Sequence, residues 1–450
     1  MVETETPVSK KRKFAFIYRD ASRLWIFIIC IIVLFVTINI NWGGKNKNLN
    51  IIRSDAKCYY LYLPGVFIYH DLNFSFTDQI EFNTYYDKFN CLDCRRYDDG
   101  RAYSKVTAGV AMVQIPFFLA AHACALILGY PADGYSRPYQ LMPTIAALFY
   151  LFLGLWFLNK LVKTYNISAK SRVIMMLCCV FGTNLFYYSV GEPGLSHVYS
   201  FAFINMLAYY MRLYFTKGNM RFIIYSAAIC GIIFLIRPVN MIILPGLLVL
   251  AGDFQQLKQK IMLLKQKIIP LLIAVFCFLA IVSIQMILFK LQTGKYWIFT
   301  YGNEGFHFLK PEIINILFSY KKGLFLYTPM YLVSLTGIYF LYKKQKLSGI
   351  LLMVFLFLFT YVVSSWWNWW YGGSFSSRVY VDILAFFMLP LAFLIDAVKS
   401  KIRKILLILC LFLLVSICQI QTFQYRYYKI HWEDMTKEKY WDNFLRIDQL

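Results

Sequence analysis

The sequence predicts an all-α polytopic membrane protein, and three observations support this prediction. Of the 450 residues, 60% are hydrophobic and only 15% are charged, whereas soluble globular chains are about 45–50% apolar and about 25% charged. The mean hydropathy is +0.55. Many segments approach the roughly 20 mostly apolar residues that a helix needs to cross about 30 Å of hydrocarbon. The prediction rests on this repetition and not on any single segment.

Apolar segments suited to membrane spans number about eleven by the hydropathy criterion. They occupy approximately residues 24–41, 139–159, 173–190, 197–216, 222–236, 238–252, 268–289, 323–342, 347–364, 379–397 and 404–421. Only Arg237-Pro238 separates the fifth from the sixth, so these two form either two spans with a tight turn or one broken helix pair. The predicted domains are a cytoplasmic N-terminus, a transmembrane bundle with a large outer loop, and an outer tail, at residues 1–23, 24–421 (loop 42–138) and 422–450.

The basic residues set the expected orientation. They cluster in every second short connection, at Lys160–Arg172, Arg212–Arg221, Lys258–Lys267, Lys343–Lys346 and Lys399–Lys404. Because Lys and Arg are enriched in cytoplasmic loops, these connections are expected to face the cytoplasm. The net charge of +23 is explained in this way and does not indicate a nucleic-acid partner. A bacterial inner membrane, with the opposite loops in the periplasm, is the expected location.

The apolar run 106–128 breaks this alternation. Counted as a full span, it would place every later basic cluster outside. It also contains Gly109, Gln114, Pro116 and His122, which suit a lipid-facing span poorly. We therefore predict an interfacial or re-entrant helix on the outer face.

Two candidates for chemistry lie in the first outer loop. Asp55 follows the first span and precedes an aromatic stretch that contains Tyr59 and Tyr60. A carboxylate there can act as a general base, and partial burial would raise its pKa and strengthen it; an ordinary solvated helix cap is the alternative. Lys105, at the start of the interfacial helix, can hold a lipid phosphate as a point charge, although snorkelling of its side chain would also explain it.

These motifs resemble a known family. An acidic residue after the first span, a loop ending in Gly100-Arg101-Ala102-Tyr103-Ser104-Lys105, and an apolar interfacial helix are similar to the GT-C superfamily of membrane glycosyltransferases. Protein O-mannosyltransferases and the aminoarabinose transferases that modify lipid A have the most similar patterns. The motif resemblance covers roughly residues 50–140. It implies that Asp55 is the catalytic base and that Lys105 binds the phosphate of a polyprenyl carrier.

Further polar residues stand at the expected mouth of the bundle. Glu192 and His197 are candidates for positioning the acceptor or a divalent metal. Their spacing is unspecific, and the alternative is an ordinary Pro-Gly turn that carries polar side chains. Arg237 lies between two apolar runs, where a charge is usually functional, and is expected to pair with a phosphate or with a buried carboxylate such as Glu192. Arg378 follows the small-residue loop 372–377, whose N–H groups can approach an anion, and its planar fork suits phosphate; an interfacial arginine in a flexible connection is the alternative.

Aromatic and basic side chains complete the candidate set. Four tryptophans in five positions, 366–370, exceed the needs of an interfacial belt and predict that Trp367, Trp370 and Tyr371 line a sugar or polyprenyl site. Lys321 and Lys322 are expected to meet either the carrier phosphate or anionic lipid headgroups, of which headgroups are favoured. The segment 301–307 is a candidate on the acceptor side. Cys58, Cys91 and Cys94 lie in the outer loop, where a disulfide can form.

The sequence thus predicts an inverting glycosyltransferase with a polyprenyl-phosphate sugar donor and a glycan, lipid or protein acceptor. A secondary transporter or a flippase for lipid-linked sugars is one alternative, but no repeat of the kind common in transporters is visible. An acyl- or phosphotransferase of the outer leaflet is another. No Rossmann or P-loop fingerprint occurs, so neither a nucleotide-sugar enzyme nor a nucleotide-driven pump is expected. No cofactor is certain.

Overall fold

The computed structural model describes residues 20–42, 51–84, 95–98 and 101–448, and in these ranges the chain is almost entirely helical. The sheet found here is a hairpin of β1 (Arg95–Asp98) and β2 (Arg101–Ser104). By length and composition, six helices of the described residues can cross a membrane. The prediction of an all-α polytopic membrane protein is confirmed.

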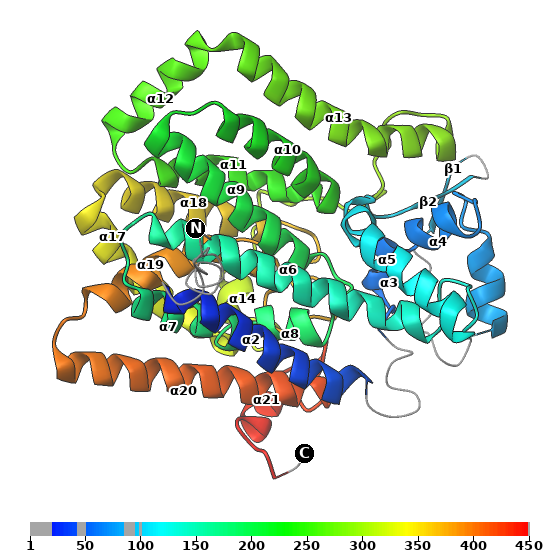
Figure 1. The fold of residues 1–450 in the computed structure, drawn as a ribbon. Helices are drawn as coiled ribbons and strands as arrows, with labels where there is room; N and C mark the ends of the chain where they lie inside the picture. Colours follow the sequence, from blue (N-terminus) through cyan, green and yellow to red (C-terminus); the bar gives the residue numbers. More distant parts are fainter. Residues whose placement is uncertain (1–19, 43–50, 85–94, 99–100, 449–450) are drawn as a thin grey trace, which may run out of the picture.

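Figure 1 shows the helices coloured in chain order. Those of the first half are α2 (Ala21–Thr37), α3 (Asp55–Tyr60), α4 (Tyr62–Phe67), α5 (Gly109–Leu128), α6 (Arg137–Lys163), α7 (Ala169–Phe181), α8 (Leu185–Val190) and α9 (His197–Lys217). Those of the second half are α10 (Arg221–Ile236), α11 (Ile243–Gly246), α12 (Phe254–Gln266), α13 (Ile268–Thr293), α14 (Ile313–Phe318), α15 (Leu324–Tyr327), α16 (Met330–Thr336), α17 (Ile338–Lys344), α18 (Lys346–Ser364), α19 (Leu384–Ala397), α20 (Lys401–Arg426) and α21 (Lys437–Asn443). Shorter π and 3-10 segments are η1 (Ile38–Trp42), η3 (Asp78–Thr84), η4 (Pro238–Ile242), η5 (Leu247–Ala251) and η6 (Arg378–Val381).

The helix boundaries follow from local chemistry. Asp20 caps α2, since its side chain accepts a hydrogen bond from the Ser22 N–H, as preferred at helix N-termini. Helix α9 ends at Gly218 with φ of 70°, a conformation that glycine adopts without strain. Helix α10 ends at Ile236 because Pro238 follows two residues later and disfavours helical backbone at Arg237, which is extended.

The basic connections meet at one end of the bundle, which we call the basic end. Lys163 and Arg172 both bind Asp20, each with a closest N···O distance of 2.9 Å. The Arg212 guanidinium lies 4.2 Å from the centre of the Tyr165 ring, and Lys344 donates to the Tyr165 carbonyl. The clustering predicted from the alternation of basic loops is therefore present in the fold, at the left of Figure 1.

The predicted outer segments meet at the opposite end, which we call the site end. There the Asn41 side chain donates to the Val190 carbonyl, and Arg426 donates to the Ile40 carbonyl at 3.2 Å. Cys58 is disulfide-bonded. Cys91 and Cys94, which the sequence placed in the same loop, lie outside the described residues.

Helix α5 lies at the site end, and by length and composition it is one of the six helices that can cross a membrane, so an interfacial or re-entrant helix here stays a prediction. Tyr150 of α6 packs against Tyr199 in the first turn of α9, with ring centroids 5.1 Å apart. The half of α6 before Tyr150 therefore extends beyond the start of α9. Helix α5 packs on this half, because Tyr150 donates to the Val113 carbonyl and His122 contacts the Tyr139 hydroxyl.

Two predicted spans are broken in the structure. The run 173–190 divides at Gly182 into α7 and α8, and the run 323–342 divides at Thr328-Pro329 and Gly337. The run 238–252 stays helical, but it passes through η4, α11 and η5. The estimate of about eleven spans treated these runs as continuous helices. Breaks are tolerated inside a bundle, since neighbouring helices and side chains satisfy the freed backbone groups.

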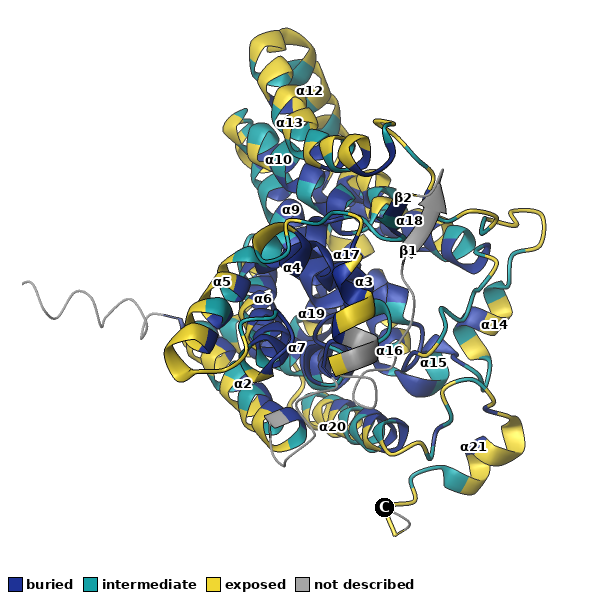
Figure 2. Ribbon diagram, turned by 90° about the vertical axis from the view of Figure 1, so that its right-hand side faces the viewer, coloured by how far each residue is buried: buried dark blue, intermediate teal, exposed yellow. Residues whose placement is uncertain are grey.

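Burial separates the centre of the bundle from its rim (Figure 2). Residues 384–395 of α19 are all buried. Helices α13 and α20 instead expose many large apolar side chains, including Ile269, Phe276, Leu406 and Phe412. Side chains of this kind are suited to contact with lipid, which is consistent with their position at the rim.

Replacing Gly109 with alanine is expected to destabilise the site end. A Cβ at Gly109 would overlap the backbone of Leu235 and Ile236, just before Arg237. Overpacking of this kind costs about 1–3 kcal/mol, so the thermal unfolding temperature in nanodiscs should fall. Gly305→Ala is the matched control, since a Cβ there has no neighbour within 4 Å. Equal unfolding temperatures for the two variants would contradict the packing described.

Candidate functional site

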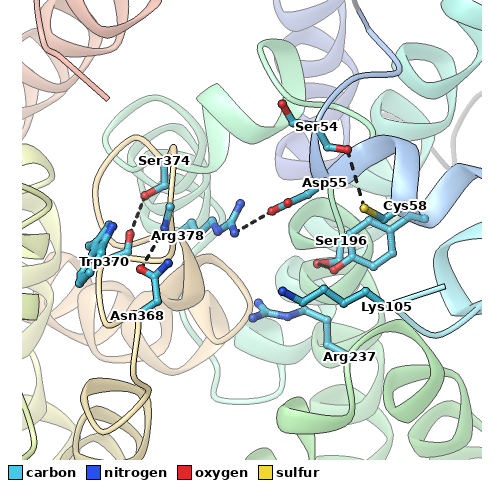
Figure 3. Close-up of polar contacts among 12 residues, drawn as sticks. Ser54, Asp55, Cys58, Lys105, Ser196, Arg237, Asn368, Trp370, Ser374 and Arg378 are labelled. Carbon is cyan, nitrogen blue, oxygen red and sulfur yellow. Dashed lines mark hydrogen bonds and ion pairs between the residues drawn. The ribbon is translucent and has the colours of Figure 1, made fainter. Parts of the chain in front are cut away.

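A small cavity at the site end is lined in part by five of the eleven predicted site residues. It is lined by Asp55, Tyr59, Leu195, Ser196, His197, Arg237 and Arg378. These residues come from α3, from the start of α9 with the turn before it, from the residue after α10, and from η6. The cavity measures about 30 Å³, which is room for about one water molecule. Figure 3 shows Arg378, Arg237 and Lys105 extending toward Asp55 from separate segments.

Asp55 is the first residue of α3, and its side chain remains 44% exposed. Its Oδ2 lies 2.8 Å from Nη2 of Arg378. Burial raises the pKa of Asp55, but the charge of Arg378 and its hydrogen bond lower that pKa by more, so the net shift is downward. The sequence predicted a raised pKa, and this was wrong because the ion pair outweighs desolvation.

Arg378 is positioned by the loop that precedes it. Tyr371, Gly372 and Ser376 have φ of 55°, 63° and 56°, and the Asn368 side chain accepts from the Gly372 N–H. The N–H groups of this loop were predicted to approach an anion. The Phe375 N–H donates instead to the Tyr188 hydroxyl at 3.0 Å. The loop therefore fixes the arginine, and the guanidinium is the group of this segment that lines the cavity.

A second carboxylate, Asp382, was missed by the sequence analysis. Its side chain is 1% exposed; Oδ1 lies 2.8 Å from Nδ1 of His197, and Oδ2 lies 2.8 Å from Nη1 of Arg237. Arg237 does pair with a buried carboxylate, as the sequence suggested, but the partner is Asp382 and not Glu192, the example given there. The available signal was a single acid four residues after Arg378, in a run that is otherwise apolar.

Lys105 occupies the edge of the site. Its Nζ lies 2.5 Å from Oε1 of Glu304 and 5.3 Å from the centre of the Tyr301 ring. Nε1 of Trp367 donates to the other Glu304 oxygen at 3.2 Å. The charge of Lys105 also contributes to lowering the pKa of Asp55. The segment 301–307, predicted to face an acceptor, thus supplies the counter-ion of Lys105.

Glu192 and His197 do not share a ligand. Glu192 binds Arg53 at 3.1 Å, whereas His197 binds Asp382. In the described ranges, no group of three or more His, Cys, Asp or Glu side chains is arranged to hold a metal ion. The sequence left dependence on a divalent metal open, and it stays untested.

The aromatic candidates divide according to the direction of their side chains. Tyr59 lines the cavity and donates to the Ser196 hydroxyl at 3.2 Å. Tyr60 instead packs against Phe118 and Tyr135, because successive residues of a helix point in different directions. Trp367, Trp370 and Tyr371 are absent from the lining of the cavity.

The two lysines before α15 do not both face headgroups. Lys322 is 1% exposed and donates from Nζ to the Ser374 carbonyl. Burial, together with the nearby charge of Arg378, lowers the pKa of Lys322 to about 7. Nζ of Lys321 lies 3.8 Å from the centre of the Trp370 ring. Lys322 therefore supports the loop that carries Arg378, and the expectation of headgroup contact was wrong for it.

Comparisons with known proteins found likeness at the level of structure. No family model and no curated protein matches this chain. The fold is similar to that of the archaeal oligosaccharyltransferase AglB from Archaeoglobus fulgidus, solved with an inhibitory peptide and a dolichol-phosphate, with a TM-score of 0.46 and 9% identity. The alignment covers 93% of this chain and 57% of that chain. A likeness at this level carries no inference about activity, so we base the functional proposal on the geometry of the site.

Proposed function

We propose that this protein is an inverting glycosyltransferase that takes a sugar from a polyprenyl-phosphate carrier at the non-cytoplasmic face of the membrane. The observation that supports this is the convergence of one half-exposed carboxylate, Asp55, with the cations Arg378, Arg237 and Lys105 at one end of a membrane bundle. A carboxylate can take the proton of an acceptor hydroxyl, and fixed cations can stabilise a phosphate that gains negative charge as it leaves.

The orientation follows from charge. The basic end carries the Lys and Arg clusters, and the positive-inside rule assigns such loops to the cytoplasm. The cavity lies at the opposite end, where the first loop, residues 190–196 and the tail meet. A carrier in the outer leaflet would keep its chain in the hydrocarbon and present its phosphate at that depth.

Donor binding must open the site. The cavity of about 30 Å³ is far below the roughly 300–1,000 Å³ of ordinary ligand pockets. The Arg378–Asp55 and Lys105–Glu304 pairs each join segments distant in sequence, so a phosphate that attracts Arg378 and Lys105 separates both. The Arg237–Asp382 pair is buried and remains in place.

The chemistry then takes one concerted step. Asp55, released from Arg378, takes the proton of the acceptor hydroxyl while the acceptor oxygen bonds to the anomeric carbon. The bond from that carbon to the phosphate oxygen breaks, and the carrier phosphate leaves with the electron pair. Arg378 and Lys105 stabilise its added charge, the kind of contribution that is usually the largest in such sites.

The test uses the full chain purified in nanodiscs. Mass spectrometry of bound lipid should find polyprenyl phosphate, and added polyprenyl-phosphate sugar should be consumed with release of polyprenyl phosphate in the presence of an acceptor extract. Bound phospholipid with acyl or phosphoryl transfer would contradict the proposal. Movement of the lipid-linked sugar across a vesicle membrane without transfer would contradict it as well.

A further inference from the structure

The pair His197–Asp382 has the arrangement of a proton acceptor that the proposed reaction does not yet use. Asp382 is held by Arg237 and is 1% exposed, so it is an ionised acceptor of hydrogen bonds. Nδ1 of His197 must therefore carry a proton and donate it to Asp382 across 2.8 Å. In the neutral ring this leaves Nε2 with a free lone pair.

Because Asp382 holds Nδ1, Nε2 is the ring nitrogen of His197 that remains for the cavity. His197 lines the cavity together with Asp55 and Tyr59. Among the described residues, Nδ1 is the ring atom of His197 that makes a hydrogen bond, and Nε2 has no protein partner. The space between these groups holds about one water molecule, which is enough for a proton to pass from Asp55 to Nε2.

The charges around His197 make its protonation dependent on the carrier. The charged and titratable groups that face it are Asp382, Arg237, Arg378 and Asp55, with Tyr59 across the cavity and the Tyr188 ring 4.9 Å away. Burial of the ring, together with the two arginines, opposes a positive charge on the imidazole in the empty site. A bound phosphate offsets them, and Asp382 then favours the imidazolium, as a buried carboxylate does for a catalytic histidine.

Asp55 is poorly suited to keep the proton that it takes. Its pKa is lowered by Arg378 in the resting site, and that pair is restored when the carrier leaves. His197 lines the same cavity and is the neighbouring group that can take the proton on.

We propose that His197, positioned by Asp382, receives the acceptor's proton from Asp55 and returns it to the departing carrier phosphate. The inference rests on the proposed function. The proton leaves the acceptor oxygen, resides on Asp55 and then on Nε2, and ends on the phosphate monoester, whose second pKa is about 6. No oxidant or reductant takes part, and the imidazole is neutral again after each turnover.

The kinetic test compares His197→Gln with His431→Asn, a control in the tail whose Nδ1 accepts from local backbone N–H groups. His197→Gln should slow single-turnover transfer by about 100-fold and should change the pH profile between pH 5 and 8. His431→Asn should keep the wild-type rate and profile. If His197→Gln keeps both while Asp55→Asn is inactive, the relay is overturned and the proposed function survives.

A second test does not need activity. The chain has five histidines, so nitrogen-15 labelling of histidine, with His197→Gln for assignment, reports the ring of His197. We expect a neutral ring protonated at Nδ1 in the empty protein and a doubly protonated ring when polyprenyl phosphate is added near pH 6.5. Asp382→Asn should abolish this change; if that variant does not fold, the wild-type titration decides alone. A ring that stays neutral with polyprenyl phosphate bound overturns the inference.

Discussion

Replacing Asp55 with asparagine is expected to lower the rate of sugar transfer by about three orders of magnitude, within the range of about 10²–10⁴ attributed to a general base. Asparagine has nearly the same shape and can still accept a hydrogen bond from Arg378, but it cannot take the proton of an acceptor hydroxyl. Binding of the carrier should therefore persist while turnover is lost. The measurement is single-turnover transfer with saturating donor in nanodiscs, together with lipid mass spectrometry.

The control for this variant is Asp442→Asn, an exposed aspartate in α21 at the same end of the protein. It should keep the wild-type rate. A folded Asp55→Asn protein that retains more than a tenth of the wild-type rate would remove Asp55 from the role of base. The opposite case, an inactive variant that has also lost its bound carrier, would assign Asp55 to binding instead.

Replacing Arg378 with glutamine is expected to reduce kcat/KM for the donor by about 10²–10³-fold, as when one fixed donor to a developing anion is removed. Arg378→Lys should fall between this variant and the wild type, since it keeps the charge but loses the planar fork. Arg446→Gln, at an exposed position in the tail, is the control. Equal kcat/KM for Arg378→Gln and Arg446→Gln would exclude Arg378 from the phosphate site.

The same variant tests the ion pair through pH. The folded-state pKa of Asp55 is lowered, mainly by Arg378 against the opposing effect of burial. A group of this kind contributes stability above its unfolded pKa, about 3.9 for aspartate, and loses the contribution as pH falls through the folded value. The gap in unfolding temperature between wild type and Arg378→Gln should therefore be largest near neutral pH and shrink below about pH 4. A gap that does not depend on pH would mean that the pair adds no stability.

The sequence located the charged side chains of the site better than it assigned their partners. Arg237 and Arg378 were recognisable because a charge beside apolar runs is costly and needs a reason. Their partners were not, because Asp55 lies 323 residues from Arg378 and Asp382 lies 145 residues from Arg237. Pairings over such separations are set by helix packing, and a local pattern contains no information about them.

The fold was likewise predicted from the sequence only in part. The alternation of basic loops correctly predicted which helix ends lie together, since that pattern depends only on composition along the chain. The breaks at Gly182 and at Thr328-Pro329 were missed, because an apolar run has the same composition whether its helix is continuous or interrupted. The direction of Tyr60 was missed because helix phase at a short element depends on what packs against it.

The three ion pairs of the site also bear on how a carrier would be selected from bulk lipid. Phospholipid headgroups crowd the same depth of the bilayer, and each carries a phosphate that an unoccupied arginine would attract. In this site each cation is already paired with a carboxylate of the protein. A headgroup that offers only its phosphate therefore replaces one anionic partner of the cation with another. A ligand whose sugar and long chain add contacts of their own can displace the carboxylate from the cation. Discrimination between carrier and phospholipid then arises because the protein's own carboxylates compete for the cations, independently of the shape of any pocket.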